Sequence, residues 1–591
     1  MSQTVLEHGE IVRVSGPIVT ARNMRAATMY EVVEVSDLRL IGEVVRVVDD
    51  VATLQVYENT SMVRPGDPVY RTGGPLTVRL GPGLIGNIYD GIQRPLKDIE
   101  AHSGAFIRRG EKTDPLDPDK RWRFVPKIKA GDAVTAGQVL GTVRETEAVE
   151  LRVMAPPGLR SPARVQSIAP EGDYAVNDQI AVIEDADHAS VPVQMAQSWA
   201  VREGRPVARR LPADRPLITG QRIIDTLFPI AKGGTAAIPG GFGTGKTMTQ
   251  HALAKWSDAD IIVYIGCGER GNEMTDVLTD FPKLIDPRSG RPLMERTILI
   301  ANTSNMPVAA REVSIYTGIT LAEFYRDQGY HVAVFADSTS RWAEALRELS
   351  ARLEEIPAEE GFPASLPTRL AQFYERAGMV EPLSGGTGSV SVVGAVSPPG
   401  GDFAEPVTQH TRRFVRCFWA LDRQLADARH YPAINWLTSY SMYLEDVEPW
   451  WKRTDPAWAE LRNQTISLLQ QEDKLQQIVK LVGPDVLPDS QRLVLTVCEI
   501  IKTGLLQQSA FDDVDMYSTP GKQMALLRAM LHFYERGKAF IGSGGTLAEV
   551  RSMAIVQELV RAKSTVPNDD EEGLRGLTKR VDEQFDRLER R

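Results

Sequence analysis

The sequence is poor in cysteine and lacks long uninterrupted apolar runs. Only Cys267, Cys417 and Cys498 occur among 591 residues, too few for a disulfide framework, which indicates a reducing compartment. No run of about 18 apolar residues is present, so no segment is expected to span a membrane. The first residues include neither a basic nor an apolar signal region. These absences predict a cytoplasmic chain that reaches a membrane only through other subunits.

The chain also has no excess of positive charge. It contains 68 Lys and Arg against 78 Asp and Glu, which gives a net charge of −10. Proteins that bind nucleic acids usually carry the opposite sign, because basic side chains must replace the counterions of the phosphates. We therefore expect no nucleic-acid partner. With 42% hydrophobic and 25% charged residues the composition is globular, and at about 150 residues per domain the length predicts about four units.

The first 75 residues have the pattern of a small β-barrel. Short strand-like segments such as Ile11–Val14, Gly42–Val48 and Ala52–Tyr57 are separated by turn residues, which is typical of small all-β domains. We therefore predict a β-barrel over residues 1–75, followed by a connector over residues 76–215.

The connector contains an all-β insertion at about residues 101–191. Two similar half-patterns, which begin at Ile128 and Ile168, each place a Gly-Asp turn before alternating apolar residues, as in the flattened β-sandwich of lipoyl and biotinyl carrier domains. Carrier activity would need a lysine between the halves, and none occurs between Lys129 and Lys232. A rigid module used for assembly is therefore favoured, since likeness of fold alone shows no chemistry.

The second half of the chain changes from alternating strands and helices to helices alone. Residues 216–440 alternate apolar strand-like runs with helical segments, which predicts an α/β domain on a mostly parallel sheet. After Ser441 the pattern is helical, with heptad-like runs such as Leu475–Leu481. The predicted fold class is multidomain α/β, with an N-terminal barrel, an inserted all-β module, a central parallel-sheet domain and a C-terminal helical domain over residues 441–591.

The motif that decides the chemistry is a complete G-x-x-x-x-G-K-[ST] phosphate loop. In such a loop successive backbone N–H groups point at phosphates, and the helix that begins there adds its positive dipole end. A strand-like segment precedes the motif and a helical one follows, which disfavours a glycine-rich turn that matches by chance. Lys246 is expected to neutralise the phosphate oxygens and Thr247 to ligate Mg²⁺. The motif residues are Gly240, Gly241, Phe242, Gly243, Thr244, Gly245, Lys246 and Thr247.

Two carboxylates follow strand-like runs of the same domain. The apolar run His331–Asp337 ends in a carboxylate, and beside a phosphate loop Asp337 would hold Mg²⁺ directly or through water; taken alone, it would more often cap a helix. Glu269 follows Lys246 by about one helix and one strand, so we expect it near the γ-phosphate, where it orients the attacking water. Arg270 could contact the γ-phosphate, with a surface ion pair as an equal alternative for this segment.

Together these motifs resemble the catalytic A subunit of the rotary V-type and A-type ATPases. The phosphate loop, Gly268–Met274 and Ala336–Ala345 carry the resemblance, which extends over nearly the whole chain. Upstream, Thr219–Ile230 resembles the segment that leads into the nucleotide domain of rotary ATPases, and downstream Ser397–Phe403 and Tyr431–Tyr440 match the A-subunit pattern. The resemblance implies that the central domain is RecA-like and that the chain hydrolyses or produces ATP with Mg²⁺ as cofactor.

The resemblance also implies partners and a base-binding site. The all-β insertion resembles the A-subunit bulge, which meets the peripheral stalk, and Leu481–Pro488 resembles the part that touches the central shaft. The family implies an alternating A3B3 ring, an arginine finger from the B-type subunit, and a membrane sector that moves H⁺ or Na⁺. Tyr431 and Phe511 match the aromatic positions that flank adenine. Without the family, either aromatic would be interpreted as a core residue.

Two alternatives belong to other functional classes. A Rho-like hexameric nucleic-acid translocase shares the nucleotide domain, but the acidic charge and the lack of a basic, aromatic strand face near the N-terminus argue against it. A non-catalytic nucleotide-binding subunit usually lacks an intact phosphate loop or the water-positioning carboxylate. This sequence has both Lys246 and Glu269, which favours a catalytic chain.

Overall fold

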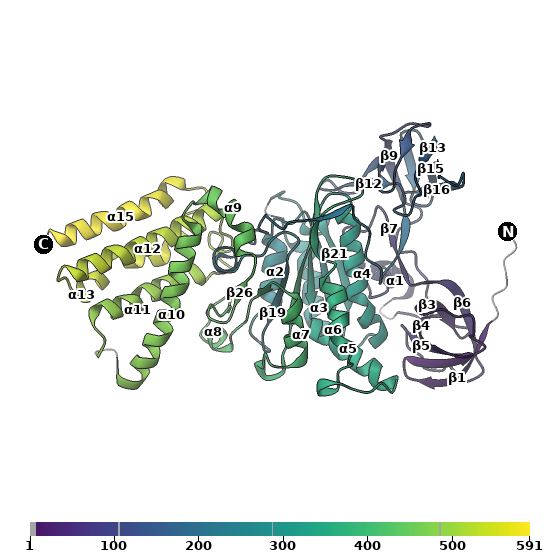
Figure 1. The fold of residues 1–591 in the computed structure, drawn as a ribbon, viewed down its shortest axis with the longest axis horizontal. Coiled ribbons are helices and arrows are strands. Elements are labelled where there is room, and N and C mark those ends of the chain that lie inside the picture. Colours follow the sequence, from purple (N-terminus) through teal and green to yellow (C-terminus); the bar gives the residue numbers. More distant parts are fainter. Residues whose placement is uncertain (1–7, 105–106, 287, 484–485, 591) are drawn as a thin grey trace. The chain divides into compact units, whose positions relative to one another are not determined.

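The computed structural model describes residues 8–104, 107–286, 288–483 and 486–590, and Figure 1 labels its helices and strands. The chain divides into two compact units. Unit 1 comprises Met1–Leu211, Ala259–Ser397 and Phe403–Phe414. Unit 2 comprises Pro212–Asp258, Pro398–Asp402 and Val415–Arg591. Among the described helices, none combines the length and the apolar character that a membrane crossing requires.

The N-terminal barrel of unit 1 is confirmed as a closed sheet with the strand order β1-β2-β5-β4-β3-β6. Its inward-facing residues alternate with polar ones, so Val33, Val35 and Leu54 lie completely buried in one apolar cluster. A register shift between Val44 and Arg46 marks a bulge where β4 pairs with β5. The strands are β1 (Gly9–Ser15), β2 (Ile18–Arg22), β3 (Glu31–Val35), β4 (Leu40–Val48), β5 (Val51–Val56) and β6 (Pro68–Pro75).

The all-β insertion is also present, as two four-stranded antiparallel sheets. One has the order β10-β13-β15-β16 and the other β12-β11-β9-β14. Apolar residues of the first sheet, together with Leu140 of the second, form a separate small core. The strands are β9 (Arg121–Pro126), β10 (Ala133–Val134), β11 (Val139–Arg144), β12 (Glu150–Met154), β13 (Ala163–Ile168), β14 (Gly172–Ala175), β15 (Gln179–Glu184) and β16 (Ser190–Gln194). The connector adds β7 (Thr77–Leu80), β8 (Ile88–Tyr89), α1 (Leu96–Ser103), β17 (Gln197–Ala200) and β18 (Arg209–Leu211).

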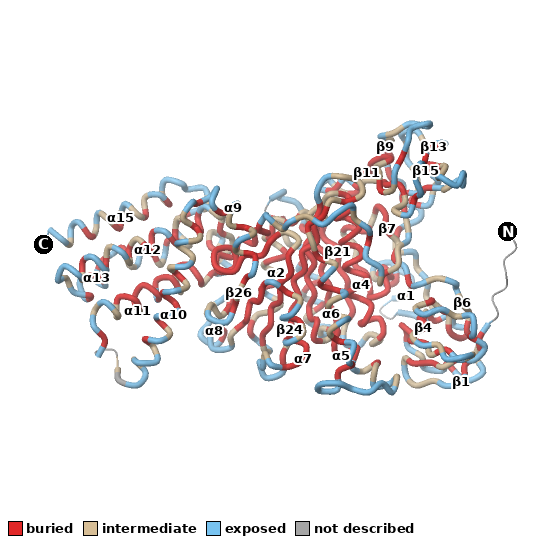
Figure 2. The backbone as a smooth tube through the Cα atoms, viewed as in Figure 1, coloured by how far each residue is buried: buried red, intermediate tan, exposed pale blue. Residues whose placement is uncertain are grey.

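The rest of unit 1 is built on parallel strands in the order β24-β22-β20-β21-β8. The sequences of these strands are continuous apolar runs because both faces of the sheet are covered, and Figure 2 shows the strands buried. α4 is buried along nearly its whole length. The strands are β20 (Ile261–Cys267), β21 (Thr297–Asn302), β22 (His331–Asp337), β23 (Gly378–Glu381) and β24 (Gly388–Val396). The helices are α3 (Gly271–Asp280), η2 (Phe281–Lys283), η3 (Leu293–Arg296), α4 (Val308–Arg326), α5 (Thr339–Arg352), η4 (Glu359–Gly361), α6 (Leu366–Tyr374) and α7 (Pro406–Phe414).

Unit 2 combines the strand before the phosphate loop with the helical end of the chain. β19 (Thr235–Pro239) pairs in parallel with β25 (Cys417–Phe418), which pairs antiparallel with β26 (Tyr440–Ser441). The described part of this unit includes the π-helical turns η1 (Ile223–Leu227) and η7 (Lys502–Leu506). The other helices are α2 (Lys246–Trp256), η5 (Pro399–Gly401), α8 (Arg423–Asp427), α9 (Leu444–Thr454), α10 (Trp458–Val482), α11 (Asp489–Ile501), α12 (Pro520–Gly542), α13 (Leu547–Arg551), α14 (Ala554–Thr565) and α15 (Glu571–Glu589).

Candidate functional site

The phosphate loop lies in unit 2 between β19 and α2. Gly243 and Gly245 have φ angles of 79° and 87°, in the left-handed region that only glycine enters without a steric penalty. At Gly240 a Cβ atom would lie 2.6 Å from Thr244 Oγ1 and 2.8 Å from Leu421 Cβ. Glycine at positions 240, 243 and 245 therefore lets the backbone turn tightly from a buried strand into a helix N-terminus.

The side chains of the phosphate loop differ in exposure, from the buried Thr244 to the exposed Phe242. Thr244 is 2% exposed, and its hydroxyl donates to the Gly241 carbonyl at 2.8 Å, so it stabilises the shape of the loop. The Lys246 ammonium donates to the carbonyls of Gly240 at 2.8 Å and Gly241 at 3.0 Å. Phe242 is 78% exposed. The Lys246 ammonium therefore lies against backbone carbonyls of the phosphate loop, where it can reach an anion bound to the backbone N–H groups of the loop.

Tyr431 packs beside the phosphate loop. A Cβ atom on Gly245 would lie 3.4 Å from Cε1 of the Tyr431 ring, and the ring remains 42% exposed. Phe511 is 90% exposed on the segment 507–518, which we call the aromatic loop. The two segments are joined because the Gln508 N–H donates to the Tyr431 carbonyl at 2.8 Å. Tyr431 thus lies beside the phosphate loop, and Phe511 belongs to a segment that is hydrogen-bonded to Tyr431 through Gln508.

The two predicted carboxylates lie together in unit 1, at the carboxyl ends of neighbouring parallel strands. β20 and β22 pair so that Gly266 lies opposite Asp337, and Glu269 follows two residues after β20. The Tyr264 hydroxyl donates to Asp337 Oδ2 at 3.2 Å. Both carboxylates therefore gather where ligands of parallel sheets usually bind.

The electrostatic environment of Glu269 is unusual. Burial, the negative charge of Asp337 and a hydrogen bond with Glu273 raise the pKa of Glu269 to about 8, against a hydrogen bond with Ser338 that lowers it. Such a carboxyl holds its proton more tightly than an exposed one, because two like charges and a low-dielectric surrounding disfavour ionisation. Strongly perturbed carboxylates of this kind are typical of functional sites.

Arg270 and two further arginines surround the turn at Glu269. Arg270 is exposed and precedes the first turn of α3. A Cβ atom on Gly268 would lie 2.7 Å from Arg341 Cβ and 2.8 Å from Arg311 Cδ. Arg311 donates to the Ser304 carbonyl at 2.9 Å. Sequence reasoning missed both Arg311 and Arg341; only Arg341 carried a signal, because it lies in the segment after Asp337.

The predicted metal ligands have suitable chemistry. Thr247 is the second residue of α2 in unit 2 and offers a hydroxyl oxygen. Asp337 ends β22 in unit 1 and offers a carboxylate. Mg²⁺ prefers such hard oxygen ligands and is commonly held by one or two protein groups plus substrate phosphates. Each of the two groups is therefore chemically suited to bind Mg²⁺.

Comparisons with known proteins match all four predicted regions. The family models are the ATP synthase alpha/beta family nucleotide-binding domain at residues 220–441, its beta-barrel domain at 11–73, the barrel-sandwich domain at 113–202, and the C-terminal domain of V and A type ATP synthase at 448–550. The chain is 57% identical to the V-type ATP synthase alpha chain of Halothermothrix orenii and to the A subunit of the A-type ATP synthase of Methanopyrus kandleri, with 98% of each chain covered. The corresponding A subunit of Thermococcus kodakarensis is 54% identical over 98% of this chain and 99% of its own.

A solved structure supports the fold. The chain resembles the assembled ATPase EscN of the type III secretion system of enteropathogenic E. coli, with a TM-score of 0.63 over 88% of this chain and 100% of that one. At 21% identity the likeness concerns the fold alone.

Proposed function

The chain belongs to the family of A-type and V-type ATP synthase A subunits, and we propose that it is the catalytic subunit of a rotary ATPase or ATP synthase. It would hydrolyse ATP, or produce it from ADP and phosphate, coupled to rotation. The observation that carries this proposal is the complete phosphate loop at the start of α2, packed against Tyr431. The family favours neither a Rho-like translocase nor a non-catalytic subunit.

The chemistry follows from placing charge rather than from a covalent intermediate. Backbone N–H groups of the loop and Lys246 would bind the β- and γ-phosphates. Glu269 would accept a hydrogen bond from the attacking water and direct it in line with the γ-phosphorus. Arg270 would contact the γ-phosphate. Thr247 and Asp337 would hold Mg²⁺, which neutralises phosphate charge when bound.

The family name also supports a set of partners. We propose an alternating A3B3 ring in which a B-type subunit supplies an arginine finger, so that the isolated chain hydrolyses ATP poorly. The all-β insertion would meet a peripheral stalk, and Leu481–Pro488 the central shaft; Pro484 and Asp485 of that segment lie outside the described residues. A membrane sector would carry H⁺ or Na⁺, which keeps this chain on the cytoplasmic side and peripheral to the membrane.

Purification of the native assembly tests this proposal directly. We expect the chain to elute together with a B-type subunit, shaft and stalk subunits and a membrane sector, and the complex to hydrolyse ATP much faster than the isolated chain. RNA should not stimulate ATP hydrolysis by the complex or by the isolated chain. Stimulation by RNA would instead support the translocase, and turnover confined to an intact site on a partner would support the non-catalytic alternative.

Tyr431 offers a test of the proposed adenine site. Tyr431→Ala is expected to weaken ADP binding by about tenfold, because stacking of a base on an aromatic ring contributes about 1–3 kcal/mol. Tyr431→Phe keeps the ring and is the matched control, with affinity close to that of the unaltered protein. Titration calorimetry of the assembled complex gives both values. If Tyr431→Ala bound ADP normally, Tyr431 would not contact the base.

A further inference from the structure

A completely buried ion pair fastens the aromatic loop to the segment that precedes the phosphate loop. The guanidinium of Arg222 lies 2.6 Å from Asp515 Oδ1, and both side chains have no exposed surface. Arg222 stands at the start of η1, and Asp515 lies near the end of the aromatic loop. A buried ion pair gains little net stability over apolar packing, because desolvation offsets the attraction. The ion pair is therefore expected to fix the position of the aromatic loop more than to raise the free energy of unfolding.

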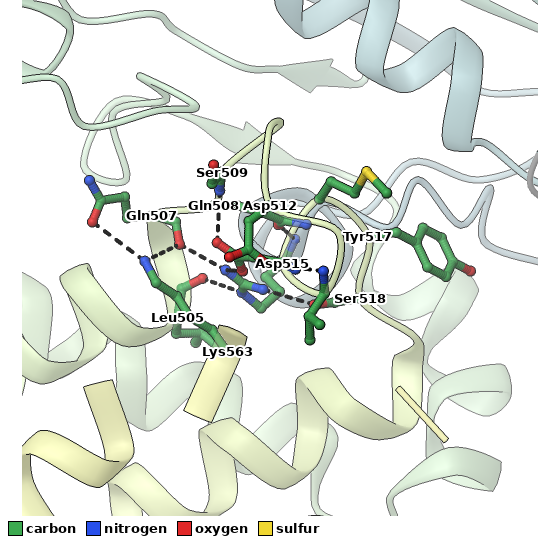
Figure 3. Close-up of polar contacts among 12 residues, drawn as sticks. Leu505, Gln507, Gln508, Ser509, Asp512, Asp515, Tyr517, Ser518 and Lys563 are labelled. Carbon is green, nitrogen blue, oxygen red and sulfur yellow. Dashed lines mark hydrogen bonds and ion pairs between the residues drawn. The ribbon is translucent and has the colours of Figure 1, made fainter. Parts of the chain in front are cut away.

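The guanidinium of Arg222 donates hydrogen bonds at both ends of the aromatic loop; Figure 3 labels the acceptor residues Leu505, Gln507 and Ser518. At one end Nε donates to the Leu505 carbonyl at 2.7 Å and Nη2 to the Gln507 carbonyl at 2.8 Å. At the other end Nη1 donates to the Ser518 hydroxyl at 2.8 Å. Because the guanidinium is a rigid planar fork, these bonds set the distance between the two ends.

The first end of the loop coincides with the end of η7, whose last carbonyls lack intrahelical partners. Lys563 supplies a second cation there, donating to the carbonyls of Thr503 at 2.7 Å and Gln507 at 3.1 Å. Figure 3 shows Lys563 and Gln507 joined in this way. Of the two carbonyls that Arg222 binds, that of Leu505 lies in the last turn of η7 and that of Gln507 directly follows this turn.

Hydrogen bonds inside the aromatic loop link the ion pair to the backbones of Phe511 and Tyr431. Asp515 Oδ2 accepts from the Ser509 N–H at 2.8 Å, and the Ser509 hydroxyl accepts from the Phe511 N–H at 3.3 Å. Gln508 Oε1 accepts from the Arg222 N–H at 2.9 Å, while the Gln508 N–H donates to the Tyr431 carbonyl at 2.8 Å. With its ring 90% exposed, Phe511 is placed by its backbone and hence by this network.

We propose that Arg222 and Asp515 are positioning residues for base recognition: their ion pair closes the aromatic loop and holds Phe511 in a fixed place relative to Tyr431. This inference rests on the proposed function, in which the two rings flank adenine. The ion pair touches neither the phosphate loop nor a phosphate in this scheme. Its loss should therefore weaken recognition of the base and leave recognition of phosphates unchanged.

The test compares ADP with inorganic pyrophosphate as competitive inhibitors of ATP hydrolysis by the assembled complex. Arg222→Lys keeps the charge but not the fork, and Asp515→Asn keeps the shape but not the charge. Each variant is expected to weaken inhibition by ADP by about tenfold, the size of a lost stacking contact. Inhibition by pyrophosphate should be unchanged. Phe511→Ala should give the same base-selective loss, and Arg222→Lys added to it should cause little further change, because both act through one contact.

A matched control is Arg462→Lys. Arg462 is also a largely buried arginine of unit 2, and it donates to the Leu227 carbonyl at 2.8 Å without touching the aromatic loop. The Arg462→Lys variant should leave the ratio of ADP affinity to pyrophosphate affinity unchanged. Thermal unfolding of each variant complex, together with its pyrophosphate inhibition, separates a local change from general loss of structure.

The outcomes distinguish this inference from the proposed function on which it rests. Normal ADP inhibition in Arg222→Lys, or an equal loss for ADP and pyrophosphate, would overturn the positioning role while Phe511→Ala still showed a base-selective loss. If Phe511→Ala itself bound ADP normally, the adenine site would be wrong. Should both ion-pair variants fail to assemble, Ser518→Ala decides: removal of one guanidinium acceptor should weaken ADP by about threefold, and an unchanged affinity would refute the inference.

Discussion

Glu269→Gln is expected to lower ATP turnover of the assembled complex by about 1000-fold, within the range that a positioned acid or base contributes. The amide has the shape of the carboxyl but cannot accept a proton from the attacking water. Nucleotide affinity should remain close to normal, because in the proposed scheme the loop at Gly240–Thr247 binds the phosphates and Glu269 does not. The change should therefore appear in kcat and not in the dissociation constant for ATP.

Steady-state hydrolysis and equilibrium nucleotide binding, measured on the same preparation, separate these two quantities. Glu348→Gln is the matched control, since Glu348 is a carboxylate on α5 paired with Arg352 at 2.9 Å, and surface pairs of this kind contribute little. Its turnover should be unaltered. Near-normal turnover in Glu269→Gln would remove Glu269 from its proposed role, and loss of ATP binding would show that it acts earlier, in ground-state binding.

Lys246→Ala is expected to weaken ATP binding by about 100-fold or more, because loss of one partner from a desolvated charge pair costs about 2–5 kcal/mol. The ammonium lies within 2.8–3.0 Å of the loop carbonyls in the structure, so its removal deletes the positive charge at the point where the phosphates would bind. The loss should be larger for ATP than for AMP, which has no β- or γ-phosphate.

Lys255→Ala is the control for Lys246, because Lys255 occupies the last turn of the same helix, over the Trp256 ring. It should bind ATP normally, which excludes a general effect of removing a lysine from α2. Binding can be followed by calorimetry and hydrolysis by phosphate release. Equal affinity of Lys246→Ala and the unaltered protein for ATP would refute a phosphate-binding role for the loop.

Local patterns in the sequence were sufficient for much of the fold and for the chemical type of the site. The eight-residue phosphate loop is contiguous, so its glycines and Lys246 could be recognised without any tertiary information. The apolar runs that became β20 and β22 predicted strands of a mostly parallel sheet, with Asp337 at the end of a strand beside the phosphate loop and Glu269 near the γ-phosphate. The structure has both carboxylates at the carboxyl edge of this sheet, while their roles and that of Arg270 remain predictions.

Contacts between distant segments were not predictable in the same way. Arg222 and Ser518 are separated by 296 positions, and neither belongs to a motif whose spacing indicates a shared site. Arg311 comes from α4 and reaches the turn at Gly268 only because α4 packs across the sheet. An arginine or aspartate inside a helical or loop pattern carries no sign of its burial, since the partner that compensates its charge lies elsewhere in the chain.

The sequence by itself determined the family, the order of barrel, insertion, nucleotide-binding region and helices, and the residues suited to bind phosphates, because periodicity and contiguous motifs are local properties of a chain. Only the tertiary structure decided which charges are buried together and how the aromatic loop is closed by Arg222 and Asp515. It also revealed that burial and a neighbouring carboxylate raise the pKa of Glu269. These properties depend on desolvation and on distances of a few ångströms between remote segments, and both exist only after the chain has folded.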